Sequence, residues 1–242
     1  MATTTDDDYT TDADLREASR SGCFARLTGW VVFLGAVGLG FAMYEMSKPQ
    51  DLTDIQGYEK STRDILHRDI RRLLQNHAEK DYPLTLTEGE INTWLAKVVR
   101  PKQGGMLAGE DKVSLDGVWV RLEDGRAEIV MERRVAGKPF TTSMFIQVSV
   151  EESDAKIRRE VKLHGGPFHE YLPFPKCGGR FGKLPVPQGF LVLTLPAFRH
   201  LAEACADEVN LIEEHMNRIT IEKGRVTFDP RSTQRTVTEI TF

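Results

Sequence analysis

The sequence lacks the features that mark several common classes of protein. Three cysteines among 242 residues are too few for a small disulfide-stapled domain. The formal net charge of −4 gives no excess of basic residues, so we expect no nucleic-acid partner. The hydrophobic fraction of 40% is too high for a disordered chain. With these classes excluded, the composition is that of an ordinary folded protein.

Recognisable catalytic and cofactor motifs are also missing. Residues 178–183 superficially resemble a phosphate-binding loop, but three residues rather than four separate Gly178 from Gly182. Leu184 also stands where that motif requires Ser or Thr. The sequence contains no G-x-S-x-G motif for a nucleophilic serine. We therefore predict a non-enzymatic protein without a cofactor.

Four candidate metal ligands lie close together in the sequence: His164, His169, Glu170 and Cys177. Their spacing matches no regular metal-binding motif, and no second histidine completes H-E-x-x-H after His169. We interpret them as polar loop residues and predict no metal site. A hydrolase would instead require His164, His169 and Glu170 to converge in one pocket.

One long apolar segment is present near the N-terminus. Residues 27–44 contain no charge, and as a helix they would extend roughly 27 Å, close to the thickness of the hydrocarbon core of a bilayer. Trp30 and Tyr44 stand near its two ends, where aromatic rings favour the lipid headgroups. The segment predicts a single transmembrane helix that anchors the chain in the cell membrane. A buried helix of a soluble protein is the alternative.

The flanking charges predict the orientation of this helix. Arg16, Arg20 and Arg26 precede it, whereas only Lys48 follows it within fifteen residues. Because positive charge stays on the cytoplasmic side, residues 1–26 should be a disordered acidic cytoplasmic tail and the rest extracytoplasmic, that is, periplasmic or extracellular. A signal peptide cleaved after Ala42 is the alternative. The pairs Ala36/Gly40 and Gly38/Ala42 permit close helix packing and at most a weak homodimer.

The remaining chain is expected to form one α+β domain. We assign residues 45–82 to a helical stalk or connecting helix, 83–228 to the domain and 229–242 to a C-terminal tail. The first helix should run from Ser61 to His77 and either stand off the membrane or pack into the domain.

A second helix has a clear start signal. Thr87 and Glu90 form an S/T-x-x-E capping box, with Leu86 and Ile91 at the positions of a hydrophobic staple. One face of the helix is then apolar, which makes it amphipathic. That face contains Ile91, Trp94, Leu95 and Val98.

Residues 112–163 change to a period of two. Turn signals at Asp124-Gly125, at Gly137 and near residues 151–154 divide them into four strands. The phase of the first strand changes at Asp116-Gly117, which a β-bulge would explain. The pattern predicts an antiparallel β-meander packed with amphipathic helices.

The next segment, residues 164–190, breaks this pattern with eleven Pro or Gly among 27 positions. We predict a long loop that is either functional or covers the core with its aromatic residues. A helix over residues 197–217 and a hairpin turning at Lys223-Gly224 should follow. Cys177 and Cys205 are expected outside the membrane, where a disulfide or a buried thiol at Cys205 are both open.

The stretch Leu86–Leu95, which reads LTEGEINTWL, resembles the helix start of YpmS-like membrane-anchored bacterial proteins. The likeness continues through the anchor, the strand meander, the segment 182–187 and the final hairpin. It departs from that pattern in the aromatic loop 164–190 and in the Thr-rich end after Pro230. Such chains are similar in layout to tubular lipid-binding (TULIP-like) domains, in which a curled antiparallel sheet wraps a long helix around an apolar groove. The resemblance carries no ligand residue with it.

Together these features predict a single-pass extracytoplasmic protein that binds lipid or another apolar ligand. The alternative is an interaction or scaffold module of a cell-envelope assembly, held in place by the anchor and contacting an envelope protein partner. An envelope hydrolase is a third hypothesis. An apolar cavity between sheet and helix would favour the first, and a tightly filled core would oppose it.

Overall fold

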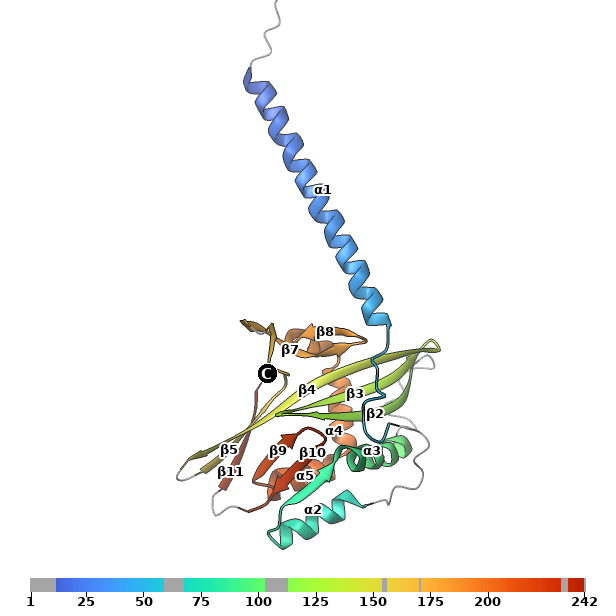
Figure 1. Ribbon diagram of the computed structural model, residues 1–242, viewed down its shortest axis with the longest axis vertical. Coiled ribbons are helices and arrows are strands. Elements are labelled where there is room, and N and C mark those ends of the chain that lie inside the picture. Colours follow the sequence, from blue (N-terminus) through green and yellow to red (C-terminus); the bar gives the residue numbers. More distant parts are fainter. Residues whose placement is uncertain are drawn as a thin grey trace, which may run out of the picture. The chain divides into compact units, whose positions relative to one another are not determined.

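The computed structural model describes residues 12–58, 68–102, 113–153, 156–169, 171–231 and 235–241 (Figure 1). Two compact units are present, Met1–Glu45 and Met46–Phe242. The described part of the first is a single helix, and the second is an α+β domain with antiparallel sheets.

The helix α1, Asp12–Ser47, contains the apolar segment. Its stretch Phe24–Ser47 is long and apolar enough to cross a membrane, and the chain itself does not bury it. Large side chains along it are exposed, with Trp30 at 63% and Leu39 at 64%. Because α1 begins at Asp12, residues 12–26 are helical rather than disordered as predicted. Extending an existing helix requires no new nucleation, and no proline interrupts this stretch.

The predicted meander is confirmed as four consecutive strands of the large sheet. Its strands pair antiparallel in sequence order: β2 Val113–Glu123, β3 Arg126–Val135, β4 Lys138–Ser153 and β5 Lys156–Lys162. The register of β2 against β3 shifts between Leu115 and Gly117, so the predicted bulge is present. Figure 1 shows the four strands fanning out from β2 to β5.

Further strands extend this sheet where the sequence predicted none. The strand β11, Arg235–Thr241, pairs parallel with β5, so the segment expected to be a C-terminal tail belongs to the sheet. The predicted loop 164–190 contains the strands β6 Pro167–His169, β7 Leu172–Phe181 and β8 Leu184–Pro187. The prediction of a long structureless loop is therefore wrong.

A glycine explains how β7 joins the sheet. β7 pairs with β4 only from Gly179 to Phe181, opposite Met144 to Thr142. A Cβ atom on Gly179 would lie 1.9 Å from the carbonyl oxygen of Ser143, so only glycine permits this approach. The glycines that suggested a loop are thus a condition for the strand pairing.

The domain begins well before residue 83, which corrects the boundary drawn from the sequence. Leu52 and Ile55 are buried against Trp119 and Val130 of the sheet. The helix α2, Ile70–Glu79, packs into the domain through Ile70 and Leu74 rather than standing apart as a stalk. Its N-cap is Asp69, whose carboxylate accepts a hydrogen bond from the backbone N–H of Arg72 at 3.2 Å. The predicted start at Ser61 lies outside the described residues.

The capping box at the next helix is confirmed. The backbone N–H of Glu90 donates to Thr87 Oγ1 at 3.3 Å, and that of Thr87 donates to Glu90 Oε2 at 2.9 Å. The helix α3, Glu88–Lys102, therefore begins directly after the strand β1, Leu84–Thr87.

A second sheet of three strands contains β1 and the predicted hairpin. Its strands β9, Arg218–Glu222, and β10, Arg225–Asp229, turn at Lys223-Gly224, where Gly224 has a φ of +74°. β10 lies between β9 and β1, with antiparallel pairing on both sides.

The helix predicted over residues 197–217 is divided in two. A short 3-10 helix η1, Gln188–Leu193, leads into α4, Leu195–Ala204, and after a break at Cys205 the chain continues as α5, Ala206–His215. Asp207 and Glu208 fall in the first turn of α5, where negative side chains favour a new helix start. Cys205 is buried at the break, and no disulfide joins it to Cys177.

Candidate ligand cavity

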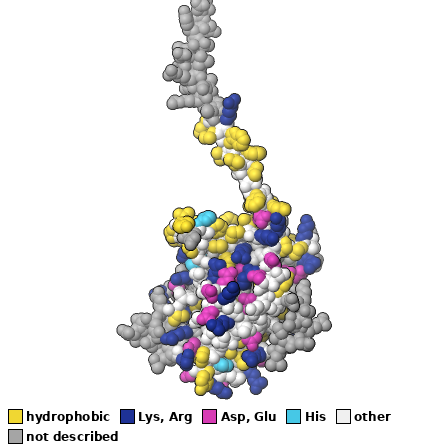
Figure 2. Space-filling view, in the orientation of Figure 1, with side chains coloured by type: hydrophobic (Ala, Val, Ile, Leu, Met, Phe, Trp, Pro, Cys, Tyr) yellow, Lys and Arg dark blue, Asp and Glu magenta, His cyan; other side chains and the backbone are white. Residues whose placement is uncertain are grey.

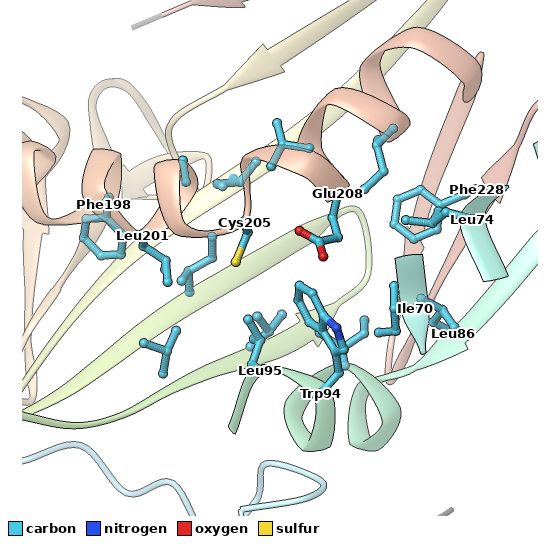
Figure 3. Close-up of a pocket in the computed structure, with 18 of the residues that line it drawn as sticks. Ile70, Leu74, Leu86, Trp94, Leu95, Phe198, Leu201, Cys205, Glu208 and Phe228 are labelled. Atoms are coloured by element: carbon cyan, nitrogen blue, oxygen red, sulfur yellow. The ribbon is translucent and has the colours of Figure 1, made fainter. Parts of the chain in front are cut away.

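An apolar cavity of about 330 Å³ lies between the large sheet and the helices of the domain (Figure 3). This volume falls at the lower end of the range of small-molecule pockets. Of the nineteen residues that line it, all but Glu208 are apolar. The apolar ones are Ile70, Leu74, Leu86, Ile91, Trp94, Leu95, Val118, Val120, Ile129, Met144, Ile146, Phe198, Leu201, Ala202, Cys205, Val209, Ile212 and Phe228.

The strands place one of their two faces against this cavity. Along β2, Val118 and Val120 line it, while the alternate residue Trp119 packs against Tyr58 on the other face. In β4, Met144 and Ile146 repeat the same alternation. The period of two in the sequence therefore divides each strand into a cavity face and an outer face.

Helices supply the facing wall. Trp94 and Leu95 project from α3, and Phe198 and Leu201 from α4 (Figure 3). Ile212 of α5 also lines the cavity. These residues repeat at helical spacing, so each helix turns one apolar stripe toward the sheet.

The cavity reaches the protein surface along α4 and α5. Ala202 and Val209 both line it and are exposed, Val209 to 37%. A ligand therefore has an entry path that does not require the core to open.

Glu208 is the single charged side chain of the lining. Figure 3 shows its carboxylate among the apolar lining residues, on the side of Trp94. Its Oε2 atom is buried and accepts no hydrogen bond from any described residue. An acceptor in this state is costly, by about 1–3 kcal/mol for a buried unsatisfied group.

The outer face of the sheet carries a buried ionic network. Glu128 is fully buried; it accepts hydrogen bonds from Arg121 Nη1 and Ser143 Oγ, both at 2.6 Å. Arg121 also donates to Asp54 at 2.8 Å, and Gln50 donates to Ser143 at 3.3 Å. The network therefore ties the start of the domain to β2, β3 and β4.

Electrostatics in this network favour the charged arginine. Burial works against protonation of Arg121, but its hydrogen bonds to Asp54 and Glu128 outweigh burial and raise its pKa. A polar cavity of about 630 Å³ lies beside the network and includes Arg121, Glu88 and Arg126 in its lining. We assign it no ligand, because the charged groups of Arg121, Glu88 and Arg126 are already paired with other side chains or with the backbone.

Two buried polar residues of α3 bind the edge of the sheet. β2 is the last strand in the sheet order, so its outer backbone groups need partners. Asn92 Nδ2 donates to the carbonyls of Val120 and Gln56 at 2.8 and 2.9 Å, and its Oδ1 accepts from Val120 N at 2.7 Å. Glu88 accepts from the backbone N–H groups of Leu122 and Gln56 at 2.6 and 2.8 Å.

The structure does not assemble a polar site from the candidate metal ligands. His164 is buried, with Nδ1 accepting from Gly166 N at 3.2 Å and Nε2 lying 3.1 Å from Lys176 Nζ. Burial, with Lys176 and Lys162 nearby, lowers its pKa below the ordinary 6.5. Burial raises the pKa of the Cys177 thiol.

The remaining candidates add nothing to such a site. His169 is exposed, with its ring against Phe168, and Glu170 lies outside the described residues. Among the described residues no three metal-ligating side chains come together.

The sequence predicted the apolar faces that line the cavity, but not the buried polar residues of α3 and α5 beside it. Glu208 lies three residues after Cys205 and four before Ile212, on the apolar face of the helix, and that position was the available signal. Glu88 and Asn92 share a helix face in the same way. No protein-family model, curated protein or solved structure matches this chain, so the interpretation depends on its own residues.

Proposed function

We propose that this is a single-pass membrane protein whose extracytoplasmic domain binds a lipid or another apolar ligand without chemical conversion. The observation that carries the proposal is the cavity of about 330 Å³, lined by apolar side chains and open along α4 and α5. Burial of each ligand methylene there would contribute about 0.8 kcal/mol.

Membrane anchoring is supported by the exposed apolar stretch of α1. An apolar helix that is not buried by its own chain needs another apolar surrounding, and its length suits a bilayer. The arginines before it support a cytoplasmic N-terminus. The YpmS-like order of elements, with a tubular lipid-binding layout, is part of the same proposal and agrees with a sheet and helices enclosing an apolar space.

The three tryptophans of the chain allow one experiment to test both parts. Trp30 lies in the anchor, Trp94 lines the cavity, and Trp119 is buried on the outer face of the sheet, only 3% exposed. Three variants, each retaining one tryptophan and carrying phenylalanine at the other two positions, would be reconstituted into vesicles of phospholipids with brominated acyl chains. Bromine quenches tryptophan only on close approach.

We expect quenching of Trp30 by the surrounding bilayer and of Trp94 by an acyl chain that enters the cavity, but not of Trp119. Absence of quenching at Trp30 would contradict the anchor. If Trp94 resembles Trp119 while Trp30 is quenched, the anchor stands and the cavity does not accept acyl chains. Circular dichroism of each variant checks that the domain remains folded.

A further inference from the structure

The position of Glu208 restricts the kind of apolar ligand that the cavity accepts. Its carboxylate lies among the apolar lining residues in Figure 3, and no described residue donates to its buried Oε2 atom. A rotation of the side chain that opens this atom to the cavity would allow a ligand with a hydrogen-bond donor to satisfy it. A fatty-acid anion would instead place a second carboxylate beside the first, which is unfavourable at low local polarity.

We propose that the cavity selects amphiphiles whose head is neutral or cationic and donates a hydrogen bond, such as an alcohol or an amine, over fatty-acid anions. The apolar tail would occupy the space between Trp94, Leu201 and Ile212, and the head would contact Glu208. This inference rests on the proposed function, since it requires an apolar ligand in the cavity.

Three photoactivatable probes with identical alkyl chains and a hydroxyl, ammonium or carboxylate head would test the selection. The full chain in lipid nanodiscs is labelled with each, and labelled peptides are quantified by mass spectrometry. Labelling of α1 measures the probe concentration in the bilayer, so the ratio of α4–α5 labelling to α1 labelling reports the cavity. We expect this ratio to be about tenfold higher for the hydroxyl and ammonium probes, which corresponds to roughly 1.4 kcal/mol.

The variant Glu208→Gln should reduce this preference to less than about twofold, mainly by raising the carboxylate ratio. The matched control is Glu214→Gln, also on α5, where the side chain is 71% exposed; it should leave the ratios unchanged. Equal ratios for the three heads in the unmodified chain, or no effect of Glu208→Gln, would overturn the inference. Labelling of α1 with none in α4–α5 would instead contradict the proposed function.

A second and independent observation concerns the surface formed by β6, β7 and η1. Hydrophobic side chains gather at the surface there (Figure 2). The most exposed of them is Tyr171, at 91%. The members of this apolar patch are Tyr171, Leu172, Phe174, Phe190, Val192 and Leu193. β7 contacts η1 directly, so the two groups of side chains lie on neighbouring elements. Patches of this kind mark interaction sites.

Charge indicates what covers the patch. Residues 171–202 contain no aspartate or glutamate but the basic residues Lys176, Lys183 and Arg199, besides Arg180, which pairs with the buried Glu128 at 3.6 Å. A surface that combines exposed aromatic and aliphatic side chains with cations is suited to the interface of an anionic bilayer.

The connection between α1 and the domain is short. α1 ends at Ser47, and Gln50, three residues later, already donates its backbone N–H to Thr141 Oγ1 of β4 at 2.9 Å. Three residues extend at most about 11 Å. β7 pairs with the adjoining residues of β4, Thr142 to Met144, so the chain enters the domain beside the strand that carries part of the patch.

We infer that the apolar patch docks into the surface of the bilayer that holds α1. The inference depends on the proposed anchor but not on the cavity. Phe174→Trp, in a chain with phenylalanine at positions 30, 94 and 119, would report docking in vesicles with brominated anionic lipids. The matched control is Tyr82→Trp, because Tyr82 is 65% exposed and lies between α2 and β1, which Figure 1 draws at the end of the domain opposite β7.

We expect at least twofold stronger quenching at position 174 than at position 82, reduced by high salt. Equal quenching at the two positions would overturn the inference. A blue-shifted but unquenched emission at position 174 would also overturn it, since it would indicate coverage by a second copy of the chain. Failure of the anchor itself is recognised separately, by loss of Trp30 quenching.

Discussion

Replacing Asn92 of α3 with alanine should strongly destabilise the domain. The amide is fully buried and makes three hydrogen bonds, two of them to the outer edge of β2 at Val120 and one to Gln56. Alanine would leave one backbone N–H and two carbonyl groups without their partner.

The magnitude follows from that count. Each hydrogen bond contributes about 0.5–1.5 kcal/mol net, and a buried group left unsatisfied costs up to about 3 kcal/mol. Partial access of water at the sheet edge moderates the loss, so we expect the free energy of unfolding to fall by about 2–5 kcal/mol. Domains have total stabilities of about 5–15 kcal/mol, so the variant should be visibly closer to unfolding.

Urea denaturation of the full chain in mild detergent, followed by tryptophan fluorescence, measures this change. Asn210→Ala is the matched control, because Asn210 is exposed on α5 and its loss should change stability by less than about 0.5 kcal/mol. A decrease of under about 1 kcal/mol for Asn92→Ala would refute the view that α3 is fixed to β2 by this amide.

Three further changes test other parts of the domain. Gly179→Ala would place a methyl group against the carbonyl of Ser143, so the free energy of unfolding should fall by about 3 kcal/mol and β7 should lose hydrogen-exchange protection. Gly189→Ala, whose added methyl group meets no neighbour, should retain that protection, and equal protection of β7 in the two variants would contradict the pairing. Glu128→Ala leaves buried cations without their carboxylate and should lower the unfolding free energy by about 3–5 kcal/mol in urea, and a neutral result would refute the network's role. The lowered pKa of His164 means that the folded state binds fewer protons than the unfolded state, so stability should fall as pH drops below 6.5. In a series of thermal melts at different pH, His164→Gln should show a smaller decrease of melting temperature below pH 6.5, and an unchanged decrease would contradict the role of His164.

Local patterns in the sequence predicted the elements whose partners are near in the chain. The meander from β2 to β5 follows from alternating residues and short turns, and the bulge near Gly117 from a change of phase. The start of α3 follows from the spacing of Thr87 and Glu90. In each case the residues that determine the element also contact one another.

Elements that depend on distant partners were not predictable in this way. β7 exists because Gly179 allows contact with β4, 36 residues earlier, and the glycines and prolines around it read as a loop when that partner is unknown. β11 pairs parallel with β5 across most of the domain. The cavity is of the same kind, because apolar stripes on α4 and β2 specify that the elements pack, but not that they leave a space between them.

The two faces of the central sheet explain why buried charge and an empty apolar space occur in one small domain. In β3, Ile129 lines the cavity while its neighbour Glu128 lies in the ionic network on the outer face. A slip of β3 by one residue would exchange the two faces of that strand and put Glu128 against the cavity, away from Arg121, which would stay on the outer face of β2. Such an arrangement would cost several kcal/mol per charge, so the network specifies the register even if an apolar pair would be equally stable. The same network fixes residues 50–54 to the sheet, and the register that keeps the cavity apolar therefore also determines where the chain from α1 joins the domain.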